Sequence, residues 1–104
     1  MLVPEPPTLV VVDVSFISLK LVLPKITEIA APRAALVALV KPQFEAGRKQ
    51  VRKGIVRDPA VHKAVCEDLI AFVATLGWEM LGVMESPIAG GDGNREFLIG
   101  SRRG

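Results

Sequence analysis

The chain has 104 residues, half of them hydrophobic, and carries a net charge of +2 with a pI near 9.0. This length fits one small domain, and the mild positive charge permits an anionic partner without demonstrating one. A single cysteine excludes a framework of internal disulfide bonds and is typical of the reducing cytoplasm. The first residues lack the pattern of a signal peptide, and no apolar run approaches the roughly 20 residues that span a bilayer. We therefore expect a cytoplasmic protein without a membrane-spanning segment.

The first 40 residues predict two buried strands joined by a helix. Residues 8–14, TLVVVDV, are apolar and β-branched, which is typical of a strand covered on both faces. Ser18 is suited to cap a helix over residues 18–30, and Pro24 is expected to kink that helix or to begin its second half. Residues 35–40, ALVALV, predict the second buried strand.

The middle of the chain predicts a long connection followed by a helix. Residues 42–57 show no clear periodicity, and a connection of this length inside a compact domain is usually functional or disordered. Asp58 and Pro59 are a favourable N-cap and first helical residue. Apolar residues then recur at helical spacing until Gly77, which is expected to end the helix.

The last part of the chain predicts two strands, at residues 78–84 and 95–100, joined by the glycine-rich loop 86–94. They are expected to pair as an antiparallel hairpin. The complete order is β-α-β-α-β-β. Strands that alternate with helices indicate parallel, right-handed connections and a three-layer α/β sheet. We therefore predict a mostly parallel sheet with an antiparallel last strand.

Two of the predicted strands end in opposite charges, Asp13 and Lys41. Because successive parallel strands end at the same edge of a sheet, both side chains should lie at the edge where α/β proteins bind ligands. A simple salt bridge explains this pattern about as well as a functional pair does. In a functional pair, the carboxylate would orient a lysine that acts as a general base. Glu96 would be a third member if the last strand lies beside the Lys41 strand.

Four blocks of the sequence resemble one family when they are taken together. They occur in the order VVVDVSFISLKLVLP, LVALVKPQFEAGR, GIVRDPAVH and SPIAGGDGNREFLI. This combination is similar to the TlyA-type (haemolysin A) RNA methyltransferases, which are related to the FtsJ-like ribose 2′-O-methyltransferases. The resemblance runs from about Thr8 to the C-terminus. One block alone would be weak, but the four blocks at this spacing are specific.

The resemblance implies a Rossmann-like methyltransferase sheet, S-adenosylmethionine as the methyl donor and a ribose 2′-hydroxyl of ribosomal RNA as the acceptor. FtsJ-like enzymes use a Lys-Asp-Lys-Glu tetrad, in which Asp13, Lys41 and Glu96 match the last three members. By this analogy Lys41 orients or deprotonates the ribose hydroxyl, and the two carboxylates position the lysine. Asp13 and Val14 are the expected cofactor contacts.

Basic side chains form the candidate RNA-binding surface. Five cations within ten residues suit contacts to RNA phosphates beside the active edge, although a solvated loop explains them equally well. The candidates are Arg48, Lys49, Arg52, Lys53, Arg57 and Arg95. His62 has no partner at metal-ligand spacing, so no metal is expected.

The resemblance also implies that part of the enzyme is missing. Family members carry, upstream of the matched blocks, a half-domain with the cofactor-binding glycine loop and the first tetrad lysine, preceded by an S4-like RNA-binding domain. Residues 1–104 resemble only the C-terminal half of the methyltransferase domain, so residues 8–12 should form an exposed edge strand. An uncharged edge and a mean hydropathy of +0.40 favour association, either as a homodimer or with the missing half. Two hypotheses therefore stay open. The chain is either the catalytic portion of an enzyme or a non-catalytic, self-associating truncated or split half. Membrane lysis is not expected, despite the family's haemolysin name.

Overall fold

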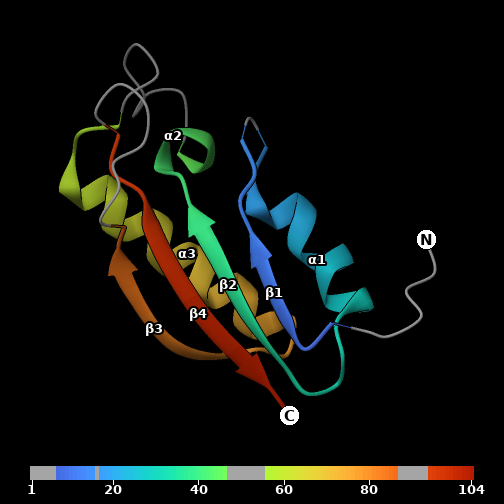
Figure 1. The fold of residues 1–104 in the computed structure, drawn as a ribbon. Helices are drawn as coiled ribbons and strands as arrows, with labels where there is room; N and C mark the ends of the chain where they lie inside the picture. The colour runs from blue at the N-terminus through green and yellow to red at the C-terminus, as the bar shows by residue number, and fades with distance from the viewer. Residues whose placement is uncertain (1–6, 16, 47–55, 87–93) are drawn as a thin grey trace.

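The computed structural model describes residues 7–15, 17–46, 56–86 and 94–104 (Figure 1). The strands and helices follow the predicted order, with one additional short helix after the second strand. They are β1 (Leu9–Val12), α1 (Leu19–Ile29), β2 (Ala34–Val40), α2 (Pro42–Glu45), α3 (Pro59–Thr75), β3 (Glu79–Glu85) and β4 (Phe97–Arg103). The loop predicted at residues 86–94 lies largely outside the described residues.

The four strands form one sheet in the order β1-β2-β4-β3. β1 pairs with β2 in parallel, whereas β4 is antiparallel to both of its neighbours. β1, β2 and β3 therefore run in one direction and β4 in the other, in agreement with the predicted strand directions. β1 has a single neighbour in this sheet and lies at its edge. The expected β3–β4 hairpin forms, with an irregularity between Met80 and Gly82.

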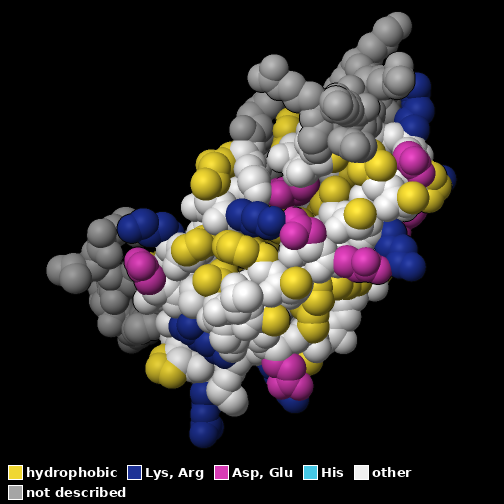
Figure 2. All heavy atoms as spheres, turned by 180° about the vertical axis from the view of Figure 1, so that it is seen from behind, with side chains coloured by type: hydrophobic (Ala, Val, Ile, Leu, Met, Phe, Trp, Pro, Cys, Tyr) yellow, Lys and Arg dark blue, Asp and Glu magenta, His cyan; other side chains and the backbone are white. Residues whose placement is uncertain are grey.

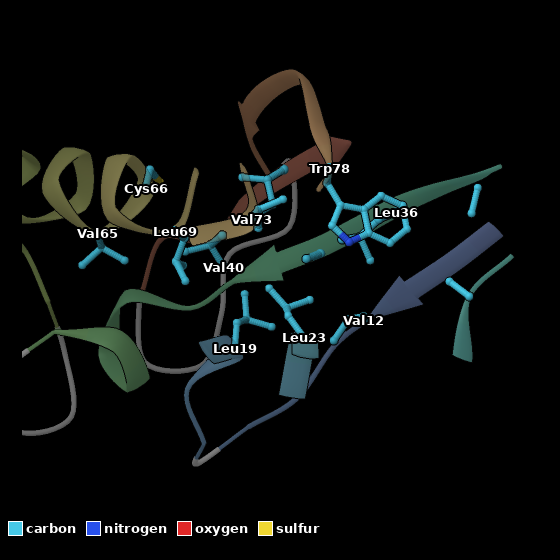
Figure 3. Packing of buried hydrophobic residues seen from close by; sticks show 14 residues of the cluster. Val12, Leu19, Leu23, Leu36, Val40, Val65, Cys66, Leu69, Val73 and Trp78 are labelled. Carbon is cyan, nitrogen blue, oxygen red and sulfur yellow. The ribbon is translucent and has the colours of Figure 1, made fainter. Parts of the chain in front are cut away.

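Both long helices cover the same face of the sheet (Figures 1 and 3). α1 contacts α3, and the Nζ atom of Lys20 lies 2.5 Å from a carboxylate oxygen of Asp68. Side chains of α1 and α3 interleave with alternate residues of the strands, because successive strand residues point to opposite faces. The buried cluster includes Val12, Leu19, Leu23, Leu36, Ala38, Val40, Leu69, Val73, Trp78 and Ile99. Charged and apolar side chains are interspersed on the outer surface of this helical layer (Figure 2).

The opposite face of the sheet is where the described residues differ from the predicted three-layer arrangement, because they form two layers. Among the described residues, no helix covers this face. Leu9 and Val11 of β1 are 61% and 68% exposed, and Leu81 and Met84 of β3 are similarly accessible. A shallow apolar groove of about 440 Å³ crosses β2, β3 and β4 on this side; it is lined by Val37, Leu81, Gly82, Val83, Met84, Leu98 and Gly100. The strands are thus apolar on both faces, as the sequence indicates, and the described helices cover one of these faces.

The helix ends follow the local signals in the sequence. The Ser18 hydroxyl accepts a hydrogen bond from the backbone N–H of Lys20, and the helix continues through Pro24 to Ile29. Asp58 caps α3 in the same way, with Pro59 as its first residue. After α3, Gly77 adopts a φ of 92°, a conformation that favours glycine. Ser18 and Asp58 therefore fix where α1 and α3 begin, and Gly77 lets the chain turn after α3.

Candidate active site

Asp13 and Lys41 are the first residues after the parallel strands β1 and β2. The Lys41 Nζ lies 2.6 Å from the Asp13 Oδ1 and donates a hydrogen bond of 2.9 Å to the Ser15 hydroxyl. The predicted neighbourhood of the two charges at one sheet edge is therefore present in the structure. Ser15 joins them because it follows Asp13 by two residues in the loop after β1.

The two charges of this pair differ strongly in their access to solvent. The side chain of Lys41 is only 13% exposed, whereas that of Asp13 is 59% exposed. A lysine ammonium has three N–H donors, and Asp13 and Ser15 engage two of them. The lysine is therefore held in place, and no further acceptor among the described residues engages its third donor, which is available to a ligand. The open side of the Asp13 carboxylate remains accessible for a cationic group.

Glu96 lies at the same edge but contacts a different side chain. β4 is the neighbour of β2, with Val40 opposite Phe97, so the strand arrangement required for Glu96 is present. Glu96 is only 9% exposed, and its Oε2 accepts a long hydrogen bond of 3.5 Å from the Gln43 Nε2. Among the described residues, the ion-pair partner of Lys41 is Asp13. Of the three expected members, Asp13 and Lys41 form a close pair, and Glu96 is a buried carboxylate at the same edge of the sheet.

Gln43 belongs to α2, the short helix that follows Lys41. Its Oε1 atom is buried, and no donor among the described side chains or backbone groups reaches it. A buried polar atom without a partner is uncommon and costs free energy. Sequence reasoning did not single out Gln43, although it lies in the KPQFE block between Lys41 and Glu45. Four residues without helical periodicity carry no signal for a helix such as α2.

Glu45 connects α2 to the N-terminus of α1. Its Oε1 accepts a 2.6 Å hydrogen bond from the Ser18 hydroxyl, and its Oε2 accepts a 2.8 Å hydrogen bond from the backbone N–H of Leu19. The contact fastens the segment after Lys41 to the segment after Asp13. It therefore supports the geometry of the Lys41–Asp13 pair from both sides.

Two of the six candidate RNA-binding residues, Arg57 and Arg95, lie within the described part of the chain. Arg48, Lys49, Arg52 and Lys53 lie outside the described residues. Arg57 and Arg95 are exposed and line one cavity of about 230 Å³. Within the described ranges, no helix is long and apolar enough to cross a membrane, and no three His, Cys, Asp or Glu side chains are grouped to bind a metal ion.

Comparison with known proteins identifies the family. Residues 1–103 match the model of the FtsJ-like methyltransferases. YqxC of Bacillus subtilis, provisionally named as an rRNA methyltransferase, is 53% identical over 94 residues, which are 89% of this chain and 34% of that protein. TlyA of Mycobacterium tuberculosis, named a 16S/23S rRNA (cytidine-2′-O)-methyltransferase, is 44% identical over 92 residues, covering 88% of this chain and 34% of TlyA.

Solved structures agree with these matches. A Lactococcus lactis protein, provisionally named as a hemolysin, superimposes with a TM-score of 0.94 at 45% identity, covering 99% of this chain and 50% of that one. A similarly named protein of Streptococcus thermophilus gives a TM-score of 0.89 at 47% identity, covering 92% of this chain and 35% of that one. The chain spans about a third of the length of the curated relatives described above. It belongs to the FtsJ-like methyltransferase family.

Proposed function

We propose that this chain is the C-terminal, catalytic half of a methyltransferase domain that transfers a methyl group from S-adenosylmethionine to a ribose 2′-hydroxyl of ribosomal RNA. The observation that carries the proposal is the Lys41–Asp13 pair, a shielded lysine held at 2.6 Å by a carboxylate at the edge where two parallel strands end. Membership of the FtsJ-like family and the name of the TlyA relative support this reaction.

Lys41 acts on the acceptor oxygen in this proposal. The free position on its Nζ binds the 2′-oxygen and either orients the hydroxyl or, when the amine is neutral, accepts its proton. The proton of the 2′-hydroxyl would pass to the neutral Lys41 amine as the oxygen takes the methyl group that bound S-adenosylmethionine would supply. Asp13 and Ser15 hold the Lys41 Nζ in place, so the acceptor oxygen bound to it would keep a fixed position. Glu96, with Gln43, shapes the buried side of the same edge.

The residues at the end of β1 fit one side of S-adenosylmethionine. The Asp13 carboxylate is 59% exposed although it pairs with Lys41, and Val14 beside it is half-buried. A carboxylate open to solvent complements the positive charge of the cofactor. When bound, S-adenosylmethionine supplies an electrophilic methyl group. We assign Asp13 and Val14 to the cofactor and the remaining cofactor contacts to polypeptide equivalent to the unmatched part of the relatives.

The basic residues are assigned to the RNA. Phosphate contacts by lysine and arginine supply affinity and position a nucleic acid without reading its sequence. We assign this task to Arg48, Lys49, Arg52, Lys53, Arg57 and Arg95. An rRNA substrate agrees with a cytoplasmic location.

The edge strand supports the second candidate function, that of a non-catalytic module that associates through its sheet. Among the described strands β1 pairs only with β2, and Leu9 and Val11 are exposed on the open face. An unprotected, uncharged edge strand is a template for pairing with a further strand. We propose that a segment equivalent to the unmatched part of the relatives covers residues 8–12, and that a second copy takes its place when that segment is absent.

A chimera provides the test of the catalytic proposal. This chain replaces the equivalent segment of YqxC, which is 53% identical over 94 residues. Transfer of tritiated methyl from S-adenosylmethionine to ribosomal RNA is then measured under single-turnover conditions. Lys41→Met should reduce the rate by at least about 100-fold, the lower end of what a positioned acid–base group contributes. Asp13→Asn should reduce it less, because Ser15 still holds the lysine.

The matched control is Lys25→Met, which removes a lysine whose side chain is 84% exposed on α1. Its rate should equal that of the unsubstituted chimera. An unchanged rate in Lys41→Met would show that Lys41 has no catalytic role.

A further inference from the structure

Two arginines that are distant in sequence meet at one cavity. Arg57 precedes α3 and Arg95 precedes β4, yet both line the same hollow of about 230 Å³. Val56, Pro59 and His62 complete its wall. Arg95 is next to Glu96 in the chain, so the cavity lies at the same end of the sheet as the Lys41–Asp13 pair.

Two buried polar side chains hold the arginine-bearing segments together. His62 is 6% exposed and Asn94 is 4% exposed. The His62 Nε2 lies 2.8 Å from the backbone oxygen of Val56, and the Asn94 Oδ1 accepts a 3.1 Å hydrogen bond from the backbone N–H of Val56. The bond to a carbonyl oxygen requires the proton on Nε2. These bonds fix Arg57 beside Arg95 and give the cavity a built framework.

The imidazole also packs against the start of β4. The ring of Phe97 is 5.5 Å from that of His62, which limits the movement of the residues just before the strand. The proposed chemistry at Lys41 uses neither His62 nor Asn94. Their burial and hydrogen bonds are explained by a role in placing the two arginines.

The charges around the cavity favour an anion. Among the described carboxylates, none lies within 4.0 Å of the Arg57 guanidinium, and Asp58 instead caps α3 through the Ala60 N–H. Arg95 forms a 3.6 Å ion pair with Glu85, but both side chains are more than half exposed. An exposed pair of this kind is weak, and a guanidinium has five N–H donors. Both arginines therefore retain donors for a ligand.

We propose that this cavity binds a phosphate group, namely a phosphodiester of the RNA substrate. Paired guanidinium groups suit phosphate because their N–H donors match two oxygens at once. The identification of RNA rests on the proposed function, and it places one backbone phosphate at a fixed distance from Lys41. The subsite would set the position of the RNA rather than read its sequence.

The test measures binding of a fluorescein-labelled ten-nucleotide oligouridine to the 104-residue chain by anisotropy at several KCl concentrations. Each phosphate contact to a single strand contributes about 0.7 to the slope of log affinity against log salt. Arg57→Gln and Arg95→Gln should each reduce the slope by about that amount. Arg57→Lys and Arg95→Lys keep the charge and should retain most of the slope, which separates a lost contact from a lost fold.

Arg102→Gln is the matched control. Arg102 has an exposed side chain like that of Arg95 and a similar ion pair, with Glu79 at 3.4 Å, but it lies at the other end of β4. It should leave the slope unchanged, whereas Glu85→Gln should tighten binding because it frees Arg95. If the two cavity variants change the slope no more than Arg102→Gln does, the proposal is wrong.

Titration with inorganic phosphate at constant ionic strength distinguishes a site for an RNA phosphodiester from a site for free phosphate. Displacement of the oligouridine, with shifts of the Arg57 and Arg95 side-chain NMR signals, is expected for a shared site. Shifts with free phosphate combined with an unchanged RNA slope in the variants would overturn the assignment to RNA. The assay contains no methyl donor, so an inactive chimera with intact arginine effects would refute the proposed function and leave the subsite standing.

Discussion

Ser18 and Glu45, which are 27 residues apart, are joined by a 2.6 Å hydrogen bond at the N-terminus of α1. The same carboxylate accepts the backbone N–H of Leu19, so the cap of α1 is shared between a local serine and a glutamate from α2. The residues that follow β1 and β2 are consequently tied to each other beside the Lys41–Asp13 pair. The stability of α1 and the shape of the candidate active site therefore depend on one another.

Glu45→Ala should lower the free energy of unfolding by about 1–2 kcal/mol, because loss of a helix cap costs about this much. Urea denaturation followed by circular dichroism measures the change. Glu28→Ala is the control, since Glu28 is exposed on α1, the helix that Glu45 caps, and forms only a 3.9 Å pair with Lys25. Equal midpoints for the two variants would show that the Glu45 contact contributes little.

Arg103 closes the other end of α1. Its guanidinium donates hydrogen bonds to the backbone oxygens of Thr27, Ala30 and Ala31 at 2.9, 2.7 and 3.1 Å. It also lies 4.8 Å from the ring of the buried Trp78. These contacts satisfy carbonyl groups that a helix C-terminus leaves without partners.

Arg103→Met keeps the aliphatic stem and removes these donors, so it should destabilise the chain by about 2–3 kcal/mol. The comparison is Arg102→Met, which removes the neighbouring arginine from an exposed pair with Glu79. That variant should lose less than about 1 kcal/mol. A loss for Arg103→Met no larger than that of Arg102→Met would contradict the capping role.

Much of this fold follows from local signals. Ser18, Asp58 and Gly77 begin or end helices where their chemistry favours it, and the apolar runs of β1 and β2 become paired parallel strands. The contact between Asp13 and Lys41 also follows, because parallel neighbours end at one edge.

Other features depend on contacts that sequence patterns do not encode. Glu45 caps α1 through Ser18, which lies 27 residues earlier, and no local pattern predicts a contact over that separation. Glu96 was expected beside Lys41, but the side chain it meets is Gln43, since neighbouring strands fix backbone positions and not the direction of a carboxylate. The apolar runs likewise show that both faces of a strand are apolar, but not what covers each face. For this reason the sequence predicted a second covering layer, which the described residues do not contain.

Cys66 gives a pH dependence with a defined sign. Burial raises the pKa of the Cys66 thiol, and the nearby Glu67 carboxylate adds to the effect. In the unfolded chain the thiol ionises near its ordinary pKa of about 8.5, before the folded chain does. The free energy of unfolding should therefore fall as the pH rises above that value, by at most about 1.4 kcal/mol per pH unit from this group.

Comparison with Cys66→Ala isolates the thiol. The unsubstituted chain should lose stability more steeply between pH 8 and 10 than the variant, while the two slopes should agree below pH 8. Identical slopes over the whole range would mean that the folded and unfolded thiols ionise alike.

The open face of the sheet should drive self-association of the chain. Val11→Lys places a charge on the exposed edge strand and should lower the apparent mass in sedimentation velocity at high micromolar concentration. Leu21→Lys is the control, because Leu21 on α1 is 69% exposed, close to the 68% of Val11. A monomeric unsubstituted chain, or an equal effect of both variants, would exclude association through β1.

The most direct test of the catalytic proposal identifies the methylated nucleoside. Ribosomal RNA treated with the YqxC chimera and S-adenosylmethionine is digested to nucleosides and analysed by mass spectrometry. We predict a 2′-O-methylated nucleoside that disappears in Lys41→Met and persists in Lys25→Met. A methyl group on a base, or a 2′-O-methylated product that survives Lys41→Met, would contradict the assignment of Lys41 and Asp13 as the catalytic pair.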